Sequence, residues 1–508
     1  MTSRGIGVVG AGISGLTLAL RLQQLGVDVT LYAESSPDGM RRSRLPNTVA
    51  RMKATRAREQ ALGSEHFALA GSLSDTAKIS IKGEPPLEFR GALEHSFHAL
   101  DFRLLIPAFL DDFTSRGGRL VVTEGSPGAA EVERWSADHE LIVVAAGRRS
   151  VAELFPRDDR RSPYDRPQRS LLAGLYSGIA PAGFSYNVSP GCGEIFQMPM
   201  WARDGLAAGM LIEAIPGSPL EPVTRLSYLD DPRAFTRTLE KALAEHAPRI
   251  AERIDPGSFA PLGPDDLLQG AVTPVVRTPV AKLSTGRVAL AIGDAWITND
   301  PITGQGANLG SHCAWVTAEA IAGGGPYGEE FGRSVAAEMW RVARPVTEWS
   351  NAFLQPPPPS TSCGFSPAPP CTGAWRTASS TCSATPSPPG PCSPTRPRST
   401  PCWPPRRRSP CRRRHDPARP AGSTGRARPG TPRDAPRPGA RRAQRARRTR
   451  RAARDGRRNG VRSTAGASYG SREDQLKVII GQLVHKVASW VAALPTWEPR
   501  RKCRRHGA

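Results

Sequence analysis

The chain has 508 residues, which is enough for two or three domains. Its formal net charge of +23 is concentrated at one end, because residues 361–508 hold 33 of the 69 Lys and Arg but 6 of the 46 Asp and Glu. Residues 1–360 therefore carry a net charge of −4 and give no reason to expect nucleic-acid binding. No apolar run approaches the roughly 20 residues that span a bilayer, so no membrane segment is expected.

The chain opens with the pattern of a nucleotide-binding βαβ unit. An apolar strand, a glycine-rich turn, a helical pattern and a second strand follow one another over residues 5–9, 10–15, 16–25 and 27–32. In such a unit Gly10 permits the tight turn, Gly12 lets the backbone approach a pyrophosphate, and Gly15 lets the helix pack closely. An acid after the second strand is placed to bind a ribose hydroxyl. The candidate cofactor-binding residues of this unit are Gly10, Gly12, Ile13, Ser14, Gly15 and Glu34. A strand–helix turn without a ligand is the alternative.

Further elements are expected to extend this half of the chain. Residues 76–90 alternate as short strands do, and residues 101–118 have a helical pattern that ends at a pair of glycines. The apolar runs at 119–123 and 141–146 are typical of buried strands, and the second run leads into Gly147.

The stretch from about 165 to 275 has a different pattern, with short apolar runs between Pro and Gly turns. These runs favour an antiparallel sheet and lie at residues 171–176, 194–200 and 206–213. One helix is expected to begin at Pro232 after Asp231. Its buried face would carry Leu239, Leu243 and Ile250.

A second glycine segment, near residue 300, indicates which dinucleotide is bound. Residues 287–294 read as a buried strand that ends at Asp294, and a helix is expected to begin near Gly306. An aspartate at that strand end can bind a ribitol hydroxyl, while Gly304 and Gly306 let the backbone approach a planar ring. The helix N-terminus can stabilise negative charge on a reduced flavin. The alternative for Asp294 is that it caps a turn.

This order of pieces resembles the FAD-containing aromatic hydroxylases and, more closely, the epoxidase component of styrene monooxygenases and their indole-oxidising relatives. The stretches that carry the resemblance occur in the family's order at residues 44–49, 100–104, 167–169, 231–235, 251–256, 268–270 and 293–308. The resemblance implies an α/β fold, in which a Rossmann-like FAD-binding domain carries an inserted mixed or antiparallel β-sheet substrate domain. The expected boundaries are 1–165 and 276–355 for the FAD-binding domain, and 166–275 for the substrate domain.

The same resemblance implies the remaining site residues. Arg44, Asn47 and Thr48 would lie on a loop at the flavin edge as the candidate catalytic residues, although Pro46 departs from the family pattern. A solvated charge is the alternative for Arg44, which follows two other arginines. The other residues expected around the FAD are Arg103, Gly147, Asp294, Pro301, Gly304, Gln305, Gly306, Ala307 and Asn308.

The chemistry expected from this site belongs mostly to the cofactor. No paired carboxylates, nucleophile triad or metal-ligand spacing stands out, so no metal is expected. Reduced FAD reacts with oxygen to a C4a-hydroperoxide, and epoxidation of an alkene then needs a held substrate but no base. The protein's tasks are to exclude water and to orient a small apolar aromatic substrate such as styrene or indole.

The expected partners and location follow from the same reading. No second glycine fingerprint for NAD(P)H is present, which agrees with transient transfer of reduced FAD from a separate NADH-dependent flavin reductase. Single-component hydroxylases also lack that fingerprint, so the two classes stay open. Two distant cysteines, Cys192 and Cys313, precede residue 356 and favour a reducing cytoplasm without a disulfide framework. A homodimer is a further candidate assembly.

Other functions compete with this reading. The first is a self-contained NAD(P)H-driven flavin hydroxylase, and a non-catalytic flavoprotein is the second. A flavin halogenase is less favoured, because no Trp-x-Trp-x-Ile-Pro segment occurs. A nucleic-acid binder would carry its affinity in residues 361–508, and that affinity would fall steeply with salt.

The last third of the chain has a composition that cannot build a core. Residues 356–470 are rich in Pro and Arg, with 23 prolines and six cysteines between 356 and 438, and they are expected to be disordered. Residues 471–495 have apolar residues at helical spacing, which predicts an amphipathic helix. Because the bias begins abruptly at Pro356, we hypothesise that a reading-frame shift replaced the family's C-terminal helices. Resequencing that gives an unshifted frame with no homologous helix downstream would reject this hypothesis.

Overall fold

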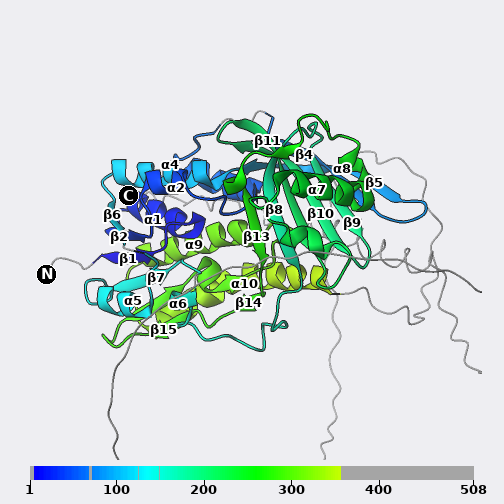
Figure 1. The fold of residues 1–508 in the computed structure, drawn as a ribbon. Coiled ribbons are helices and arrows are strands. Elements are labelled where there is room, and N and C mark those ends of the chain that lie inside the picture. Colours follow the sequence, from blue (N-terminus) through cyan, green and yellow to red (C-terminus); the bar gives the residue numbers. More distant parts are fainter. Residues whose placement is uncertain (1–4, 68–70, 124, 148, 356–508) are drawn as a thin grey trace, which may run out of the picture. The chain divides into compact units, whose positions relative to one another are not determined.

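The computed structural model describes residues 5–67, 71–123, 125–147 and 149–355. The expectations for residues 356–470 and 471–495, and the frame-shift hypothesis, concern residues outside these ranges. Within them the strands form a six-stranded sheet, a nine-stranded sheet and a two-stranded ribbon of β14 (Val275–Val276) and β17 (Ile297–Thr298). The two large sheets belong to one compact unit of the chain, and Figure 1 shows them at its two ends.

The six-stranded sheet is Rossmann-like. Its order is β15-β16-β7-β1-β2-β6, and all neighbours are parallel except the β15–β16 pair. The strands β1, β7 and β16 are buried along their whole length, as parallel strands covered on both faces are. The bounds are β1 Ile6–Val9, β2 Val29–Ala33, β6 Arg119–Val122, β7 Leu141–Val144, β15 Val280–Lys282 and β16 Val288–Ala291. The strands β1, β2, β6, β7 and β16 confirm predicted strands, whereas β15 was not predicted.

Helices cover this sheet. The helix α1 packs against both α4 and α9. The helix α4 begins where the Asp101 side chain accepts a hydrogen bond from Arg103 N, and it ends before Gly117, whose φ of +82° suits a glycine. The bounds are α1 Ile13–Gln24, α2 Pro37–Arg41, α3 Lys53–Ala61, α4 Phe102–Ser115, α5 Ala129–Trp135, α6 Arg149–Ala152, α9 Gly306–Ala322 and α10 Glu329–Leu354.

The nine-stranded sheet has the order β12-β8-β11-β10-β9-β4-β5-β3, with β13 also paired to β8. Most of its pairs are antiparallel, whereas β4 and β9 are parallel. The bounds are β3 Val49–Arg51, β4 Leu73–Ile81, β5 Leu87–Leu100, β8 Ser170–Ser177, β9 Phe184–Ser189, β10 Gly193–Ala202, β11 Gly205–Ala214, β12 Ala260–Pro261 and β13 Leu267–Ala271. The expected α/β class with a second, mixed sheet is confirmed.

One boundary differs from the expectation. Residues 1–165 were assigned to the FAD-binding half, but β3, β4 and β5 pair within the nine-stranded sheet, where residues 77–81 of β4 lie beside residues 184–188 of β9. The alternating pattern of a strand indicates that one of its faces is buried, but it does not indicate which other strand will form hydrogen bonds with it. The substrate-side sheet is therefore built from two segments that are far apart in the sequence.

The predicted helix at Pro232 is α7 (Pro232–His246), with the Asp231 side chain accepting a hydrogen bond from Ala234 N. Leu239, Leu243 and Ile250 are buried against the nine-stranded sheet, as predicted. Ile250 lies in a separate short helix, α8 (Pro248–Ala251), because Pro248 cannot continue the hydrogen bonding of α7. The remaining single turns are η1 Glu221–Arg225, η2 Pro264–Asp266, η3 Gly293–Ala295 and η4 Pro301–Thr303. Among the described helices, none is both long and apolar enough to cross a membrane.

Candidate active site

The glycine turn after β1 has the geometry that its sequence predicts. Gly10 has a φ of +105°, and a Cβ there would lie 2.8 Å from Ala146 N. A Cβ on Gly15 would lie 1.8 Å from the Gly10 carbonyl oxygen, so this helix packs where a side chain has no room. Gly12 differs, because nothing lies within 4 Å of the place where its Cβ would be. Its backbone therefore borders open space at the N-terminus of α1, which has no side-chain cap.

The carboxyl ends of three neighbouring strands meet at this turn. Residues Val9, Val144 and Ala291 are in register, so the loops after β1, β7 and β16 leave the sheet at one edge. A Cβ on Gly147 would lie 2.3 Å from the Cβ of Asp294, which makes Gly147 a packing residue for that aspartate. Candidates that are remote in the sequence are thus brought together at one edge of the sheet.

The Ser14 side chain is buried at the same edge of the sheet and is directed toward Gly293 and Gly310. A Cβ on Gly293 would lie 2.6 Å from Ser14 Oγ, and one on Gly310 would lie 2.2 Å from the same atom. The Ser14 side chain therefore occupies the gap between α1, the strand end and α9. Ile13 is also buried, so it contributes to the core beside the turn. Glu34 follows β2 directly and is half-buried, at the place expected for an acid that binds a ribose.

Asp294 is reached by solvent, yet many protein atoms surround its carboxyl group. This crowding raises the pKa of Asp294, and the nearby Arg277 guanidinium opposes the shift. Arg277 Nη1 also donates a hydrogen bond to the Asp294 carbonyl oxygen at 3.1 Å, which fixes the backbone of the turn. Asp294 is an accessible acceptor on a fixed backbone, as binding a ribityl hydroxyl requires.

The loop from Pro301 to Gly304, called here the flavin loop, leads from Asp300 to α9. Gly304 is in the left-handed conformation with a φ of +62°, and neither Gly304 nor Gly306 has an atom within 4 Å of a built Cβ. Gln305, the N-cap of α9, makes no side-chain cap and instead donates to the Thr303 carbonyl oxygen at 3.3 Å. Open space therefore borders the backbone of this uncapped helix start, where N–H groups can stabilise a planar, partly anionic ring.

Asn308 corrects one expectation, because its side chain is fully used within the protein. Its Oδ1 accepts from Met52 N at 3.0 Å and from Thr55 Oγ1 at 2.7 Å. Its Nδ2 donates to the carbonyl oxygens of Ala50 and Gly304, both at 2.9 Å. The Asn308 side chain therefore ties the flavin loop to the segment from β3 to α3 and has no polar atom left for a flavin. Ala307 packs against the core of the six-stranded sheet.

Arg103 also differs from its expected role. It is almost wholly buried, and its Nε and Nη2 donate to the Asp101 carboxylate while Nη2 also donates to Asp266. Its Nη1 donates to the Asp265 carbonyl oxygen at 3.3 Å. The guanidinium thus faces carboxylates of its own chain rather than an open site. The family resemblance placed Arg103 near the cofactor. A sequence motif does not indicate which groups form ion pairs with the guanidinium.

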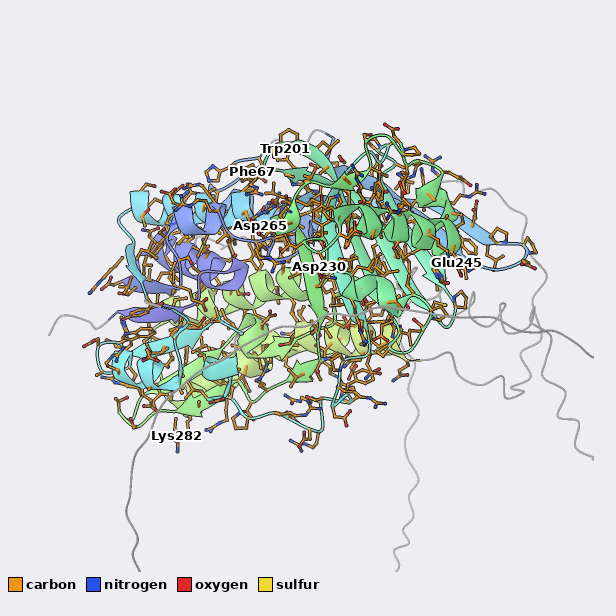
Figure 2. All side chains as sticks on the ribbon, viewed as in Figure 1. Phe67, Trp201, Asp230, Glu245, Asp265 and Lys282 are labelled. Carbon is orange, nitrogen blue, oxygen red and sulfur yellow. The ribbon has the colours of Figure 1, made fainter. Side chains whose placement is uncertain are left out.

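The loop from Arg44 to Thr48 is held by the same turn. Leu45 N donates to the Asp265 carbonyl oxygen at 2.7 Å, and the exposed Arg44 side chain lies 3.9 Å from the Asp265 carboxylate. Figure 2 shows Asp265 between the parts of the chain that carry the two sheets. Arg44 therefore points toward an exposed acid and does not line the cavity described below. Asn47 Oδ1 is buried without a hydrogen-bond partner among the described residues, and Thr48 lines that cavity.

A cavity lies between the nine-stranded sheet and the flavin loop. About 850 Å³ of space free of protein atoms lies there, open solvent at its mouth included. Apart from two threonines, a tyrosine and a tryptophan, its lining side chains are apolar, and none of them is charged. The lining residues are Thr48, Ala50, Met52, Ala77, Ile79, Phe97, Phe184, Tyr186, Phe196, Met198, Gly209, Leu211, Pro301, Ile302, Thr303, Gly304, Trp349 and Phe353.

The aromatic part of this lining was missed in the sequence. Tyr186 and Phe196 stack with ring centroids 4.7 Å apart, and Phe97 meets Phe184 edge-on at 5.4 Å. These residues lie on β5, β9 and β10, which come together only in the folded sheet, with β4 between β5 and β9. The period-two spacing of Phe184 and Tyr186 was the available signal, since both must face the same side of β9.

The residues present fit a bound FAD. Open space borders the backbone of Gly12, Gly304 and Gly306, two helix N-termini lack side-chain caps, and Asn47 Oδ1 is an acceptor without a donor. Among the described residues no cluster of His, Cys, Asp and Glu is arranged to hold a metal ion. A Rossmann-like sheet, a returning Gly-Asp strand and an apolar cavity roofed by a second sheet together define the class of FAD-dependent monooxygenases.

Comparison with known proteins identifies the family. Residues 147–253 match the substrate-binding domain of styrene monooxygenase A, and residues 8–43 match an NAD(P)-binding Rossmann-like domain. Two curated proteins named styrene monooxygenase StyA, from Pseudomonas fluorescens and a Pseudomonas species, are 36% identical over 358 residues. The alignment covers 69% of this chain and 85% of each relative. The chain belongs to the styrene monooxygenase StyA family, as the resemblance predicted, and FAD is its cofactor.

Solved structures share the fold at much lower identity. The flavin-dependent brominase Bmp2, as a triple mutant, is 14% identical with a TM-score of 0.51, covering 69% of this chain and 88% of that one. The probable FAD-dependent monooxygenase pqsL from Pseudomonas aeruginosa is 17% identical with a TM-score of 0.50, covering 69% of this chain and 95% of that one. These likenesses support the fold of the described residues and no finer statement.

Proposed function

We propose that this chain is the oxygenase of a two-component monooxygenase and epoxidises a small apolar aromatic alkene such as styrene or indole. The observation that carries this proposal is the uncharged, aromatic-lined cavity that reaches the flavin loop. The StyA relatives, named as styrene monooxygenases, support the same substrate class. FAD would arrive reduced from a transient NADH-dependent flavin reductase, and a cytoplasmic location and a homodimer stay predictions.

The residues that would hold the cofactor are those that border open space. The backbone of Gly12 at the start of α1 would face the pyrophosphate, and Glu34 would bind the adenosine ribose. Asp294 would bind the ribityl chain, and the N-terminus of α9 at Gly306 would stabilise negative charge on the ring system. Bound reduced FAD supplies the activated oxygen in this family, and the protein supplies position and a dry surrounding.

The cavity walls would orient the substrate. Aromatic side chains such as Phe184 and Phe196 give a flat ring apolar contact without polar atoms to satisfy. The side chains of Met52 and Met198 adjust to its shape. An alkene that accepts an oxygen atom loses no proton, so the cavity needs no carboxylate or histidine to act as a base. Asn47 and Thr48 would then act by forming hydrogen bonds near the reacting oxygen. A catalytic role for Arg44 has less support, because its side chain is exposed and faces Asp265.

The test uses the purified full chain, chemically reduced FAD, air and styrene or indole, with no NAD(P)H present. Styrene oxide or indigo would support oxygen transfer from externally reduced flavin. Product that requires NAD(P)H with oxidised FAD would instead favour the single-component hydroxylase. A chain that binds reduced FAD but converts neither compound would reject the substrate class and leave the family fold.

A further inference from the structure

The face of the nine-stranded sheet that lines the cavity continues into buried charged residues. Phe196 of β10 pairs with Leu211 of β11, and both line the cavity. Two residues further along these strands, Glu194 pairs with Glu213. Because side chains alternate across a strand, the two glutamates lie on the same face as the cavity lining. The apolar wall thus ends in two carboxyl groups that are almost completely buried.

The nearest cation is already used by the first of these glutamates. Arg169 donates from Nε to Glu194 Oε2 at 2.7 Å and from Nη2 to Glu194 Oε1 at 3.0 Å. Its Nη1 donates to the Gln168 carbonyl oxygen at 2.9 Å. The Arg169–Glu194 pair is therefore close to neutral and bidentate. It does not provide a hydrogen-bond donor to Glu213.

Glu213 faces a second carboxyl group instead of a donor. Neither of its carboxyl oxygens has a hydrogen-bond donor among the described residues, and its side chain is wholly buried. Asp300, which precedes the flavin loop, lies within hydrogen-bonding reach of it. Asp300 Oδ1 accepts from Ile302 N at 3.1 Å, while its Oδ2 also lacks a donor. Two ionised carboxylates in this place would leave three buried oxygens unsatisfied and repel one another.

A single proton between the two groups resolves this arrangement. We propose that Glu213 is a neutral carboxylic acid that donates a hydrogen bond to the Asp300 carboxylate, and that this bond fastens the substrate sheet to the flavin loop. Asp300 keeps the negative charge because a backbone N–H already stabilises it. Glu213 is thus a positioning residue that acts through Asp300. Its effect on catalysis rests on the proposed function, whereas its protonation does not.

The titration of the pair follows from its surroundings. Burial and the neighbouring Asp300 and Glu194 raise the pKa of Glu213 well above its usual value, and the same burial raises the pKa of Asp300 to about 6. Arg169 opposes both shifts, and Tyr186 and Tyr164 are the other titratable groups that face the pair. Because the pKa of Glu213 is higher in the folded than in the unfolded chain, its protonated form stabilises the fold. This stabilisation is complete at low pH and is lost as the pH rises through the folded-state pKa. Alkaline pH is therefore expected to loosen the flavin loop.

The direct test is infrared spectroscopy of the flavin-free full chain at neutral pH. The wild-type spectrum should contain the carbonyl stretch of buried protonated carboxylic acids, to which Glu59 also contributes because burial raises its pKa to about 7. Glu213→Gln should remove the Glu213 part of this band, and the exposed-site control Glu330→Gln should retain it. If the wild type and Glu213→Gln have equal bands, the proposal is overturned. If Glu213→Gln does not fold, Asp300→Asn replaces it. An amide there donates to Glu213 and lowers its pKa, so the same band should weaken.

The consequence for the cofactor is measured by FAD titration across pH. Wild-type affinity should fall about tenfold or more from neutral to alkaline pH, a change that corresponds to one pKa unit of coupling. Glu213→Gln keeps a donor to Asp300 but cannot ionise, so its affinity should stay nearly constant, while Glu330→Gln should follow the wild type. Equal pH dependence in wild type and Glu213→Gln would contradict the positioning role. A chain that binds no FAD at any pH would refute the proposed function, and the infrared band would still decide the protonation of Glu213.

Discussion

Replacement of Asn308 by alanine tests how the flavin loop is held. The Asn308 side chain makes four hydrogen bonds that connect α9 with Met52 N, Thr55 Oγ1 and the carbonyl oxygens of Ala50 and Gly304. It is nearly buried, so water does not readily replace these bonds in the folded chain. Asn308→Ala should therefore lower the stability of the fold and release the Gly304 carbonyl group.

The magnitude follows from the number of bonds. A hydrogen bond between neutral groups contributes about 1 kcal/mol net, so the loss of four predicts about 4 kcal/mol less free energy of unfolding. The matched control is Asn299→Ala. Asn299 is also nearly buried near the flavin loop, but neither of its side-chain polar atoms has a partner among the described residues. Its truncation breaks no such bond and should change the free energy of unfolding by less than about 1 kcal/mol.

Urea unfolding of the flavin-free wild type and of both variants measures these free energies, and FAD titration measures the release of the flavin loop. Asn308→Ala should also weaken FAD binding by about tenfold, because a loss of about 1.4 kcal/mol at the loop corresponds to that factor. Equal destabilisation by Asn308→Ala and Asn299→Ala would refute the account, since the hydrogen bonds would then not be the source of the effect.

Three further predictions concern other parts of the site. Gly147→Ala places a Cβ 2.3 Å from the Asp294 Cβ, so FAD titration should show about tenfold weaker binding, and unchanged affinity would contradict the packing argument. Leu211→Phe narrows the cavity, so the KM for styrene should rise about tenfold, and an unchanged KM would contradict the assignment of this cavity to the substrate. His98 is buried, and its pKa is lowered to about 3 by desolvation and, to a smaller extent, by Arg51 and Arg56. Neutral His98 therefore stabilises the fold at pH values above the unfolded pKa of about 6.5, and this stabilisation is lost as the pH falls. Wild type should lose about 3 kcal/mol more than His98→Gln between neutral pH and about pH 4, and equal losses in urea unfolding would show that another group dominates.

The local parts of the site were predictable from the sequence. Gly10 and Gly15 lie where the strand–turn–helix pattern puts them, because the positive φ of Gly10 and the contact of Gly15 with the Gly10 carbonyl oxygen are local features. The strand before Asp294 and the helix after Gln305 were also predicted, since a buried parallel strand and a helix start each have a local signature. The fold class followed from the order of these pieces.

The partners of the polar side chains were not predictable in the same way. Arg103 and Asn308 occur in segments that resemble cofactor-binding motifs, yet both use their side chains within the protein. The sequence does not indicate whether a polar group faces a ligand or another residue, because that depends on packing between remote segments. The pairing of β4 with β9 brings the aromatic lining together, and the contact of Glu213 with Asp300 joins residues 87 positions apart. Neither leaves a local pattern.

The central claim is that oxygen from air reaches an apolar alkene through reduced FAD held beside this cavity. A single-turnover reaction with chemically reduced FAD, oxygen-18 gas and styrene, without NAD(P)H, tests it most directly. The account predicts styrene oxide that carries one oxygen-18 atom, and it predicts less of this product in Leu211→Phe at equal FAD occupancy. Reoxidation of the flavin with no labelled epoxide, or epoxide labelled from water, would contradict the account.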